Sequence, residues 1–283
     1  MMNTTASSHT LLRRASARWV IALGILFCGL MPNPLPAQVT MGLTPGMVNQ
    51  TFKPGQPFHL ELVVTNGREA PVQMRGVAMD WWYDEKNEKI FGPPGSLPRS
   101  ASNWIEFVPR QFTVPAKGAY RVKLVVTPPA TASGGYYSVA FLESRPELAQ
   151  PATAERKAVF ANVRLGCLLL LSAENTEEHR IVLSEAQLSA PGPNRNLALD
   201  FLLENQSNSH IFPRVEMAVL DAARELVAKS QGETKRFLPR QKDRITMTWG
   251  GTLPRGNYTA ILTIVYGKDR IYTQEFPFTV EGN

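Results

Sequence analysis

Short runs in which apolar and polar residues alternate follow one another along most of this chain. The clearest stretch is Asn103 to Ser144, where three such runs are separated by Pro- and Gly-rich segments. Each run is too short to span a membrane, and none has apolar residues repeating every 3.6 positions. Alternation with a period of two is typical of antiparallel strands that have one face against a core. The pattern therefore predicts an all-β protein.

The first runs of the pattern predict an edge segment and a regular strand. Gln38 to Lys53 is interrupted by Pro45-Gly46, which favours an edge position because proline cannot donate to a ladder. Phe58 to Asn66 alternates without interruption and ends at Asn66-Gly67, a dipeptide typical of turns. We expect this second run to be a strand with one buried face.

The run from Pro71 to Asp84 changes phase at Gly76. Val72 and Met74 alternate before the glycine, and Trp81 belongs to a series of the opposite parity after it. A β-bulge at Gly76 would return all of these side chains to one face of the sheet, with Trp81 in the core. The sequence therefore predicts a bulged strand.

The second half of the chain repeats the first. The run that begins at Leu60 aligns with the run that begins at Leu199, at a constant offset of 139 positions that places Asn66 over Asn205. Tyr137 and Tyr258 each follow a Gly-x step into a late strand, a pattern typical of the tyrosine corner of immunoglobulin-like sandwiches. We therefore predict two tandem immunoglobulin-like antiparallel β-sandwich domains, residues 38–173 and 174–283.

The first 37 residues have the three parts of a secretory signal peptide. Basic residues precede a short apolar run from Trp19 to Leu30, and a proline-rich segment then ends at Ala37. The apolar run is shorter than the roughly 20 residues that a membrane anchor requires. We expect cleavage near Ala37, export to the periplasm or cell surface, and no integral membrane segment in the mature chain.

Removal of this peptide changes the charge of the protein. The full chain has a net charge of +6, with 30 Lys and Arg against 24 Asp and Glu. Residues 1–37 contain three arginines and no acidic residue, so 27 basic residues and a net charge of +3 remain. The mature chain has no polybasic run, which argues against nucleic acid as a partner. Cys167 is then the one cysteine left, so an internal disulfide is excluded.

Catalytic and cofactor motifs are absent from the sequence. There is no Gly-x-Ser-x-Gly elbow and no phosphate-binding glycine loop, and we predict no enzyme activity and no cofactor. His59 and Glu61 share a strand face but lack further ligands, so we predict no metal site.

A small surface patch is the remaining candidate for small-ligand chemistry. Asp80 and Asp84 flank Trp82 on one parity of a predicted strand, an arrangement that suits a carbohydrate or peptide surface. The alternative is that Trp82 packs under the irregular segment from Phe91 to Arg99.

The run from Lys157 to Ala173 is the last predicted strand of the first domain. It alternates over an unusual length and ends in the unbroken apolar series Leu168 to Leu171. Two interpretations are open. A strand buried on both faces has this composition, and so does an edge that recruits a strand from another chain.

The first domain resembles the amino-terminal domain of periplasmic pilus-assembly chaperones. The resemblance is carried by a Pro-Gly turn before FHLELVVTN and by WWYDEKNEKI, FVPRQFTVPAKGAYRVKLVV and GGYYSVAFLES. It implies that the last strand of this domain lends apolar side chains to an incomplete pilin sandwich, while basic residues bind the terminal carboxylate of the pilin. In this chain the residues so implied are Val163, Arg164, Leu165, Cys167 and Leu169, with Arg164 as the cation.

The chain lacks a second basic residue that is typical of this family. The family has one in its first strand, whereas the segment QVTMGLTPGMVNQ has none before Lys53. Our leading hypothesis is a non-enzymatic exported protein that binds other exported polypeptides, pilin-like or surface proteins, as an assembly chaperone acting by β-strand addition. The alternative is a cell-envelope or surface adaptor that binds wall or surface components.

Overall fold

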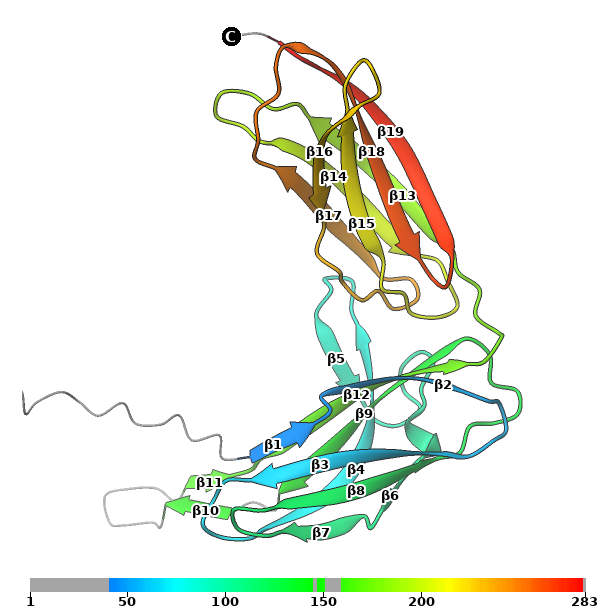
Figure 1. The fold of residues 1–283 in the computed structure, drawn as a ribbon. Helices are drawn as coiled ribbons and strands as arrows, with labels where there is room; N and C mark the ends of the chain where they lie inside the picture. The colour runs from blue at the N-terminus through cyan, green and yellow to red at the C-terminus, as the bar shows by residue number, and fades with distance from the viewer. Residues whose placement is uncertain (1–40, 145–146, 151–158, 282–283) are drawn as a thin grey trace, which may run out of the picture. The chain divides into compact units, whose positions relative to one another are not determined.

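The computed structural model describes residues 41–144, 147–150 and 159–281, and this part of the chain is almost entirely β (Figure 1). The predicted signal peptide lies outside the described residues. A single-turn 3-10 helix, η1 (Ser102–Trp104), interrupts the strands. The strands of the first half are β1 (Met41–Thr44), β2 (Met47–Phe52), β3 (Phe58–Asn66), β4 (Val72–Tyr83), β5 (Lys89–Gly92), β6 (Ile105–Val108), β7 (Gln111–Val114), β8 (Ala119–Val126), β9 (Gly135–Ser144), β10 (Glu147–Gln150), β11 (Val159–Ala161) and β12 (Arg164–Ala173). Those of the second half are β13 (Ile181–Ser189), β14 (Leu197–Asn205), β15 (Arg214–Leu220), β16 (Leu226–Gln231), β17 (Lys242–Trp249), β18 (Gly256–Tyr266) and β19 (Arg270–Val280).

Strands β1 to β9 and β12 form the first sandwich. A four-stranded sheet in the order β1-β3-β8-β6 packs on a larger sheet in the order β2-β12-β9-β4-β5, in which β7 also pairs with β4. Side chains from both sheets share one buried core that includes Leu62, Leu124 and Leu142. The strand predicted from Phe58 to Asn66 is confirmed at both ends. Alternation thus placed the core-facing residues of this strand correctly.

The first strand changes sheets at Pro45-Gly46. Before this point β1 pairs antiparallel with β3, and after it β2 pairs parallel with β12. The predicted edge segment is therefore divided between the two sheets, and β2 covers one end of β12.

The predicted bulge at Gly76 is wrong. The pairing of β4 with β9 runs without a register shift from Met74 to Met79. The change of phase instead means that β4 buries both faces: Met74 belongs to the core between the sheets, whereas Trp81 belongs to a second cluster. At Gly76 a Cβ would lie 2.3 Å from the ring of Phe107, so the glycine is required by packing.

Strands β13 to β19 form the second sandwich. Its sheets have the orders β13-β14-β17 and β16-β15-β18-β19, and their facing side chains form a separate core. The all-β, immunoglobulin-like fold predicted for both halves is confirmed. The exact division into residues 38–173 and 174–283 stays a prediction.

The internal repeat is visible in two buried asparagines. The Nδ2 of Asn66 donates to the carbonyl oxygens of Ala70 and Pro115, while its Oδ1 accepts from the backbone N–H of Arg68. Asn205 makes the corresponding bonds in the second sandwich: Nδ2 donates to the carbonyls of Ser209 and Phe237, and Oδ1 accepts from the N–H of Ser207. The aligned asparagines thus fix the same turn twice.

The two tyrosines predicted to be corner residues differ. The hydroxyl of Tyr258 donates to the carbonyl oxygen of Pro254 at 2.8 Å, which confirms the prediction for this residue. The hydroxyl of Tyr137 lies 3.5 Å from Nδ1 of His210, a residue of the second sandwich, and the corner prediction is wrong for Tyr137.

Candidate functional site

The candidate site is the first half of β12, where the strand has a partner on one side. β12 pairs with β9 from Arg164 to Ser172, whereas β2 pairs with it only from Leu168 to Ala173. Among the residues that the structure describes, no strand pairs the second side of residues 164–167. Within the described residues this short stretch is therefore an open edge; β1 lies near β12 but pairs with β3.

The hydrogen bonds on either side of β12 show which backbone groups are open. The carbonyl of Val163 accepts from the N–H of Ser144 on the β9 side, and the N–H of Leu168 donates to the carbonyl of Gly46 on the β2 side. Successive residues in an antiparallel strand point their backbone groups to opposite sides. The N–H and C=O groups of Arg164 and Gly166 therefore point away from β9, toward the open side.

The inward side chains of β12 belong to the protein's own core. Cys167 and Leu169 are both 0% exposed and lie in the core between the sheets. Burial raises the pKa of the Cys167 thiol to about 12, because the thiolate would lose its hydration. The expectation that these two side chains are offered to a partner is wrong. Val163 and Leu165 are only partly buried against the same core.

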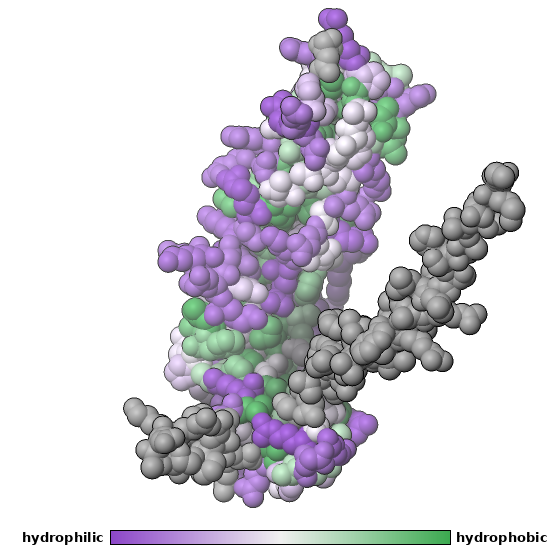
Figure 2. Space-filling view, turned by 90° about the vertical axis from the view of Figure 1, so that its left-hand side faces the viewer, coloured by the Kyte–Doolittle hydropathy of each residue, from purple (hydrophilic) through white to green (hydrophobic). Residues whose placement is uncertain are grey.

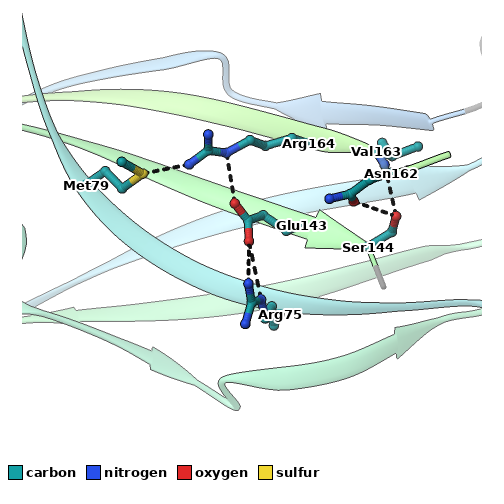
Figure 3. A network of polar contacts seen from close by, with 7 residues as sticks. All are labelled: Arg75, Met79, Glu143, Ser144, Asn162, Val163 and Arg164. Carbon is teal, nitrogen blue, oxygen red and sulfur yellow. Dashed lines mark hydrogen bonds and ion pairs between the residues drawn. The ribbon is translucent and has the colours of Figure 1, made fainter. Parts of the chain in front are cut away.

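Arg164 is held in an ion-pair network on the outer face of the sheet (Figure 3). Its Nε lies 2.9 Å from Glu143, which also bonds Arg75, and its guanidinium lies 3.7 Å from the centre of the Phe141 ring. The Arg164 side chain is 40% exposed, so the ion pair itself contributes about 1 kcal/mol or less. The implied cleft cation is thus already paired within the chain.

The single strand predicted from Lys157 to Ala173 is divided in two. The hydroxyl of Ser144 accepts from the backbone N–H of Val163 and also contacts Asn162, as Figure 3 shows. This side-chain bond replaces a ladder bond and separates β11 from β12. β11 pairs instead with β10, so that a two-stranded ribbon precedes the open edge.

The expected surface patch does not form as predicted. Asp80 is 1% exposed, and its carboxylate accepts from the hydroxyl of Ser100 and the N–H of Leu97. Burial acts to raise the pKa of Asp80, but these and neighbouring hydrogen bonds outweigh it and lower the pKa. Asp80 is therefore a structural anion rather than a surface ligand.

The other two residues of the expected patch also have structural contacts. Asp84 accepts from the N–H groups of Lys86 and Glu88 and thereby closes a turn. The ring of Trp82 lies 5.3 Å from that of Tyr137, centre to centre. Trp81 is 0% exposed, which confirms its predicted burial.

A cluster of residues that sequence reasoning missed joins the larger sheet to the second sandwich. Nε2 of the buried His210 lies 3.0 Å from Oδ1 of Asn49 on β2. The guanidinium of Arg236 stacks on Trp81 at 4.9 Å and donates to the hydroxyl of Tyr83 at 2.8 Å. These partners lie far apart in the sequence, and no local pattern marks them.

The described residues contain no group of three or more His, Cys, Asp or Glu side chains that could bind a metal ion. None of the helical structure in this part of the chain is long and apolar enough to cross a membrane.

Comparison with known proteins gives structural matches only. No protein-family model and no curated protein matches the sequence. Among solved structures, a chaperone and tip-adhesin complex of CFA/I fimbriae biogenesis is similar, with a TM-score of 0.47 and 12% identity over 83% of this chain and 97% of that one. The class 5 fimbriae chaperone CfaA has a TM-score of 0.44 and 12% identity over 86% and 100% of the two chains. A chain in the complex of the Salmonella enterica SafA pilin with the SafB chaperone has a TM-score of 0.40 and 9% identity over 85% and 96%.

Proposed function

We propose that this protein is a non-enzymatic exported protein that binds other exported polypeptides by β-strand addition, as an assembly chaperone. The observation that carries the proposal is the open side of β12 at residues 164–167. Here the N–H and C=O groups of Arg164 and Gly166 are available to an extended chain. A partner strand would continue the sheet next to β12 just before the point where β2 begins, at Met47 beside Leu168.

Two features suit this edge to strand addition. Gly166 has no side chain, and a Cβ there would lie 2.8 Å from the Phe141 ring, so the glycine keeps the strand closely packed on its outer face. Edges of this kind are normally protected by proline or by inward-pointing charges, because open backbone groups recruit other chains. Arg164, the charged residue of this stretch, points to the outer face and is paired with Glu143.

The burial of Cys167 and Leu169 is an observation that favours the alternative function, a surface adaptor. A strand whose inward side chains fill its own core does not lend those side chains to a partner, and a fixed β-sandwich is sufficient for an adaptor. In our proposal the partner bonds to the backbone of β12, and the side chains it contacts come from the outer face and from Val163 and Leu165.

The test is capture from the exported fraction of the source organism by the tagged protein and by two variants of one residue. Arg164→Ala removes the guanidinium and keeps the backbone N–H. Arg164→Pro removes both, and since this N–H points away from β9, the ladder with β9 loses no donor. We expect wild type and Arg164→Ala to capture the same polypeptides, and Arg164→Pro to bind them about tenfold more weakly.

The identity of the captured material separates the two functions. Sandwich-like subunits that lack one strand would support the assembly chaperone. Wall or envelope components would support the adaptor. Equal capture by the Ala and Pro variants, with both folded as judged by urea titration, would refute strand addition at this edge.

A further inference from the structure

A second unpaired stretch lies in the middle of β4, away from the β12 edge. β9 pairs one side of β4 up to Met79. On the other side β7 pairs Val72–Arg75 and β5 pairs Asp80–Tyr83. The chain between β5 and β7 leaves this sheet and forms β6 in the opposite one. Within the described part of the chain, residues 77–79 thus have no strand on that side.

The backbone groups of Ala78 point into this gap. The N–H of Gly76 donates to the carbonyl of Arg110 at 2.8 Å, which places the backbone groups of Gly76 on the β7 side. Alternation along the strand places those of Ala78 on the same side and those of Val77 and Met79 toward β9. The described residues supply no strand partner for Ala78 there. The backbone N–H and C=O of Ala78 therefore both lack a strand partner among the described residues.

The gap opens into a cavity of about 550 Å³ between the two sheets. Its walls are mostly apolar, and the two prolines among them have no N–H to donate. The lining comprises residues 76–79 of β4, Pro93, Pro94, Ser102, Ile105, Phe107 and the rim residues Glu106 and Arg110. On the face that Figure 2 shows, hydrophobic residues also reach the surface of the described part of the chain. One acid and one base at the rim leave the opening without net charge, which suits an uncharged ligand.

We propose that this gap is a second peptide-binding site, which takes a short extended segment of an apolar polypeptide. The backbone of one peptide residue would exchange two hydrogen bonds with Ala78, as in an antiparallel pair. Opposed residues of such a pair share a face, so the apolar side chain of that same peptide residue would enter the cavity beside Phe107. The unpaired stretch of three residues corresponds to about 10 Å of strand, so the site fits a chain end or the tip of a loop. The inference does not depend on the β12 edge.

The test uses the full chain and the capped tripeptide acetyl-Val-Leu-Val-amide, followed by amide hydrogen exchange in NMR spectra. Without peptide, we expect the Ala78 amide to exchange faster than the amides of Val77 and Met79, which are bonded to β9. At a peptide concentration about ten times its Kd, exchange at Ala78 should slow about tenfold. The control is the same peptide with a methyl group on the backbone nitrogen of leucine, which removes its donor and should give no protection.

Three results would overturn the proposal. The first is an Ala78 amide that is as protected as its neighbours before peptide is added. The second is equal protection by the methylated peptide, because contact would then not depend on backbone pairing. The third is a response confined to Arg164 and Gly166, which would place the peptide at the β12 edge and leave the gap on β4 without a ligand.

Discussion

At the scale of single residues, a few buried polar groups fix the backbone of each sandwich. Asn66 and Asn205 are 2% and 0% exposed, and each satisfies backbone groups of its own turn and of a distant segment. Loss of such a bond lowers the free energy of unfolding, because its partner groups are then buried without hydrogen bonds. The offset of 139 positions predicted the equivalence of the two residues, and their matching bonds show its structural reason.

The two tyrosines provide a prediction at this scale. Tyr258→Phe should lower the free energy of unfolding by about 1 kcal/mol, since it removes a bond of 2.8 Å to a backbone carbonyl. Tyr137→Phe should cost less, because its hydroxyl is 3.5 Å from His210. Urea titration of the two variants checks this order, and a larger loss for Tyr137→Phe would contradict it.

Cys167 provides a second prediction. The thiol is 0% exposed and burial raises its pKa to about 12, so that little thiolate forms at neutral pH. We expect maleimide to label Cys167 only after denaturant is added, as followed by mass spectrometry. Rapid labelling of the folded protein would show that β12 opens and exposes its inward face.

At the scale of elements, the alternation of apolar and polar residues predicts strands well. It does not show against which hydrophobic cluster each face of a strand packs. The limits of β3 were predicted from Phe58 to Asn66, since one of its faces is buried and the other is exposed. β4 and the second half of β12 bury both faces. The pattern of β4 therefore suggested a bulge at Gly76, and the resemblance to chaperones implied that Cys167 and Leu169 are offered to a partner. The second apolar layer, which contains Trp81 and Leu170, could not be predicted because its residues come from several strands.

Gly76 and Phe107 test this account of β4. Gly76→Ala should destabilise the protein by about 1 to 3 kcal/mol, because the new methyl group would overlap the Phe107 ring. The double variant Gly76→Ala with Phe107→Leu should recover part of the loss, and Phe107→Leu alone is the control. Additive losses in urea titration would mean that the two side chains do not compete for the same space.

At the scale of the whole molecule, the contacts between the two sandwiches could not be predicted from the sequence. His210 and Asn49 are 161 positions apart, and no motif links them. Arg236 lies on Trp81 and Tyr83 without an acidic partner among the described residues, and its Nε is buried without a hydrogen bond. These contacts depend on how the two sandwiches pack together, which local sequence patterns do not encode.

His210, which lies among the contacts between the two sandwiches, should make the stability of the protein depend on pH. Burial lowers the pKa of His210 to about 4; Glu177 acts to raise it, and Arg236 and His179 add to the lowering. The unfolded chain thus binds a proton between about pH 6.5 and pH 4 that the folded chain does not, and stability rises with pH across this window. Relative to His210→Gln, wild type should lose up to about 3 kcal/mol between pH 7 and pH 4 in urea titrations. Parallel pH profiles for the two proteins would contradict this role.

Hydrogen exchange in the complex with a captured polypeptide tests strand addition at β12 most directly. In the free protein the amides of Leu165 and Cys167 face β9 and should be protected, whereas those of Arg164 and Gly166 should exchange rapidly. Binding should protect Arg164 and Gly166 and leave Leu165 and Cys167 unchanged, because an added strand bonds only the outward groups. Protection that does not alternate along these residues, or no change at Arg164 and Gly166, would contradict the proposed function.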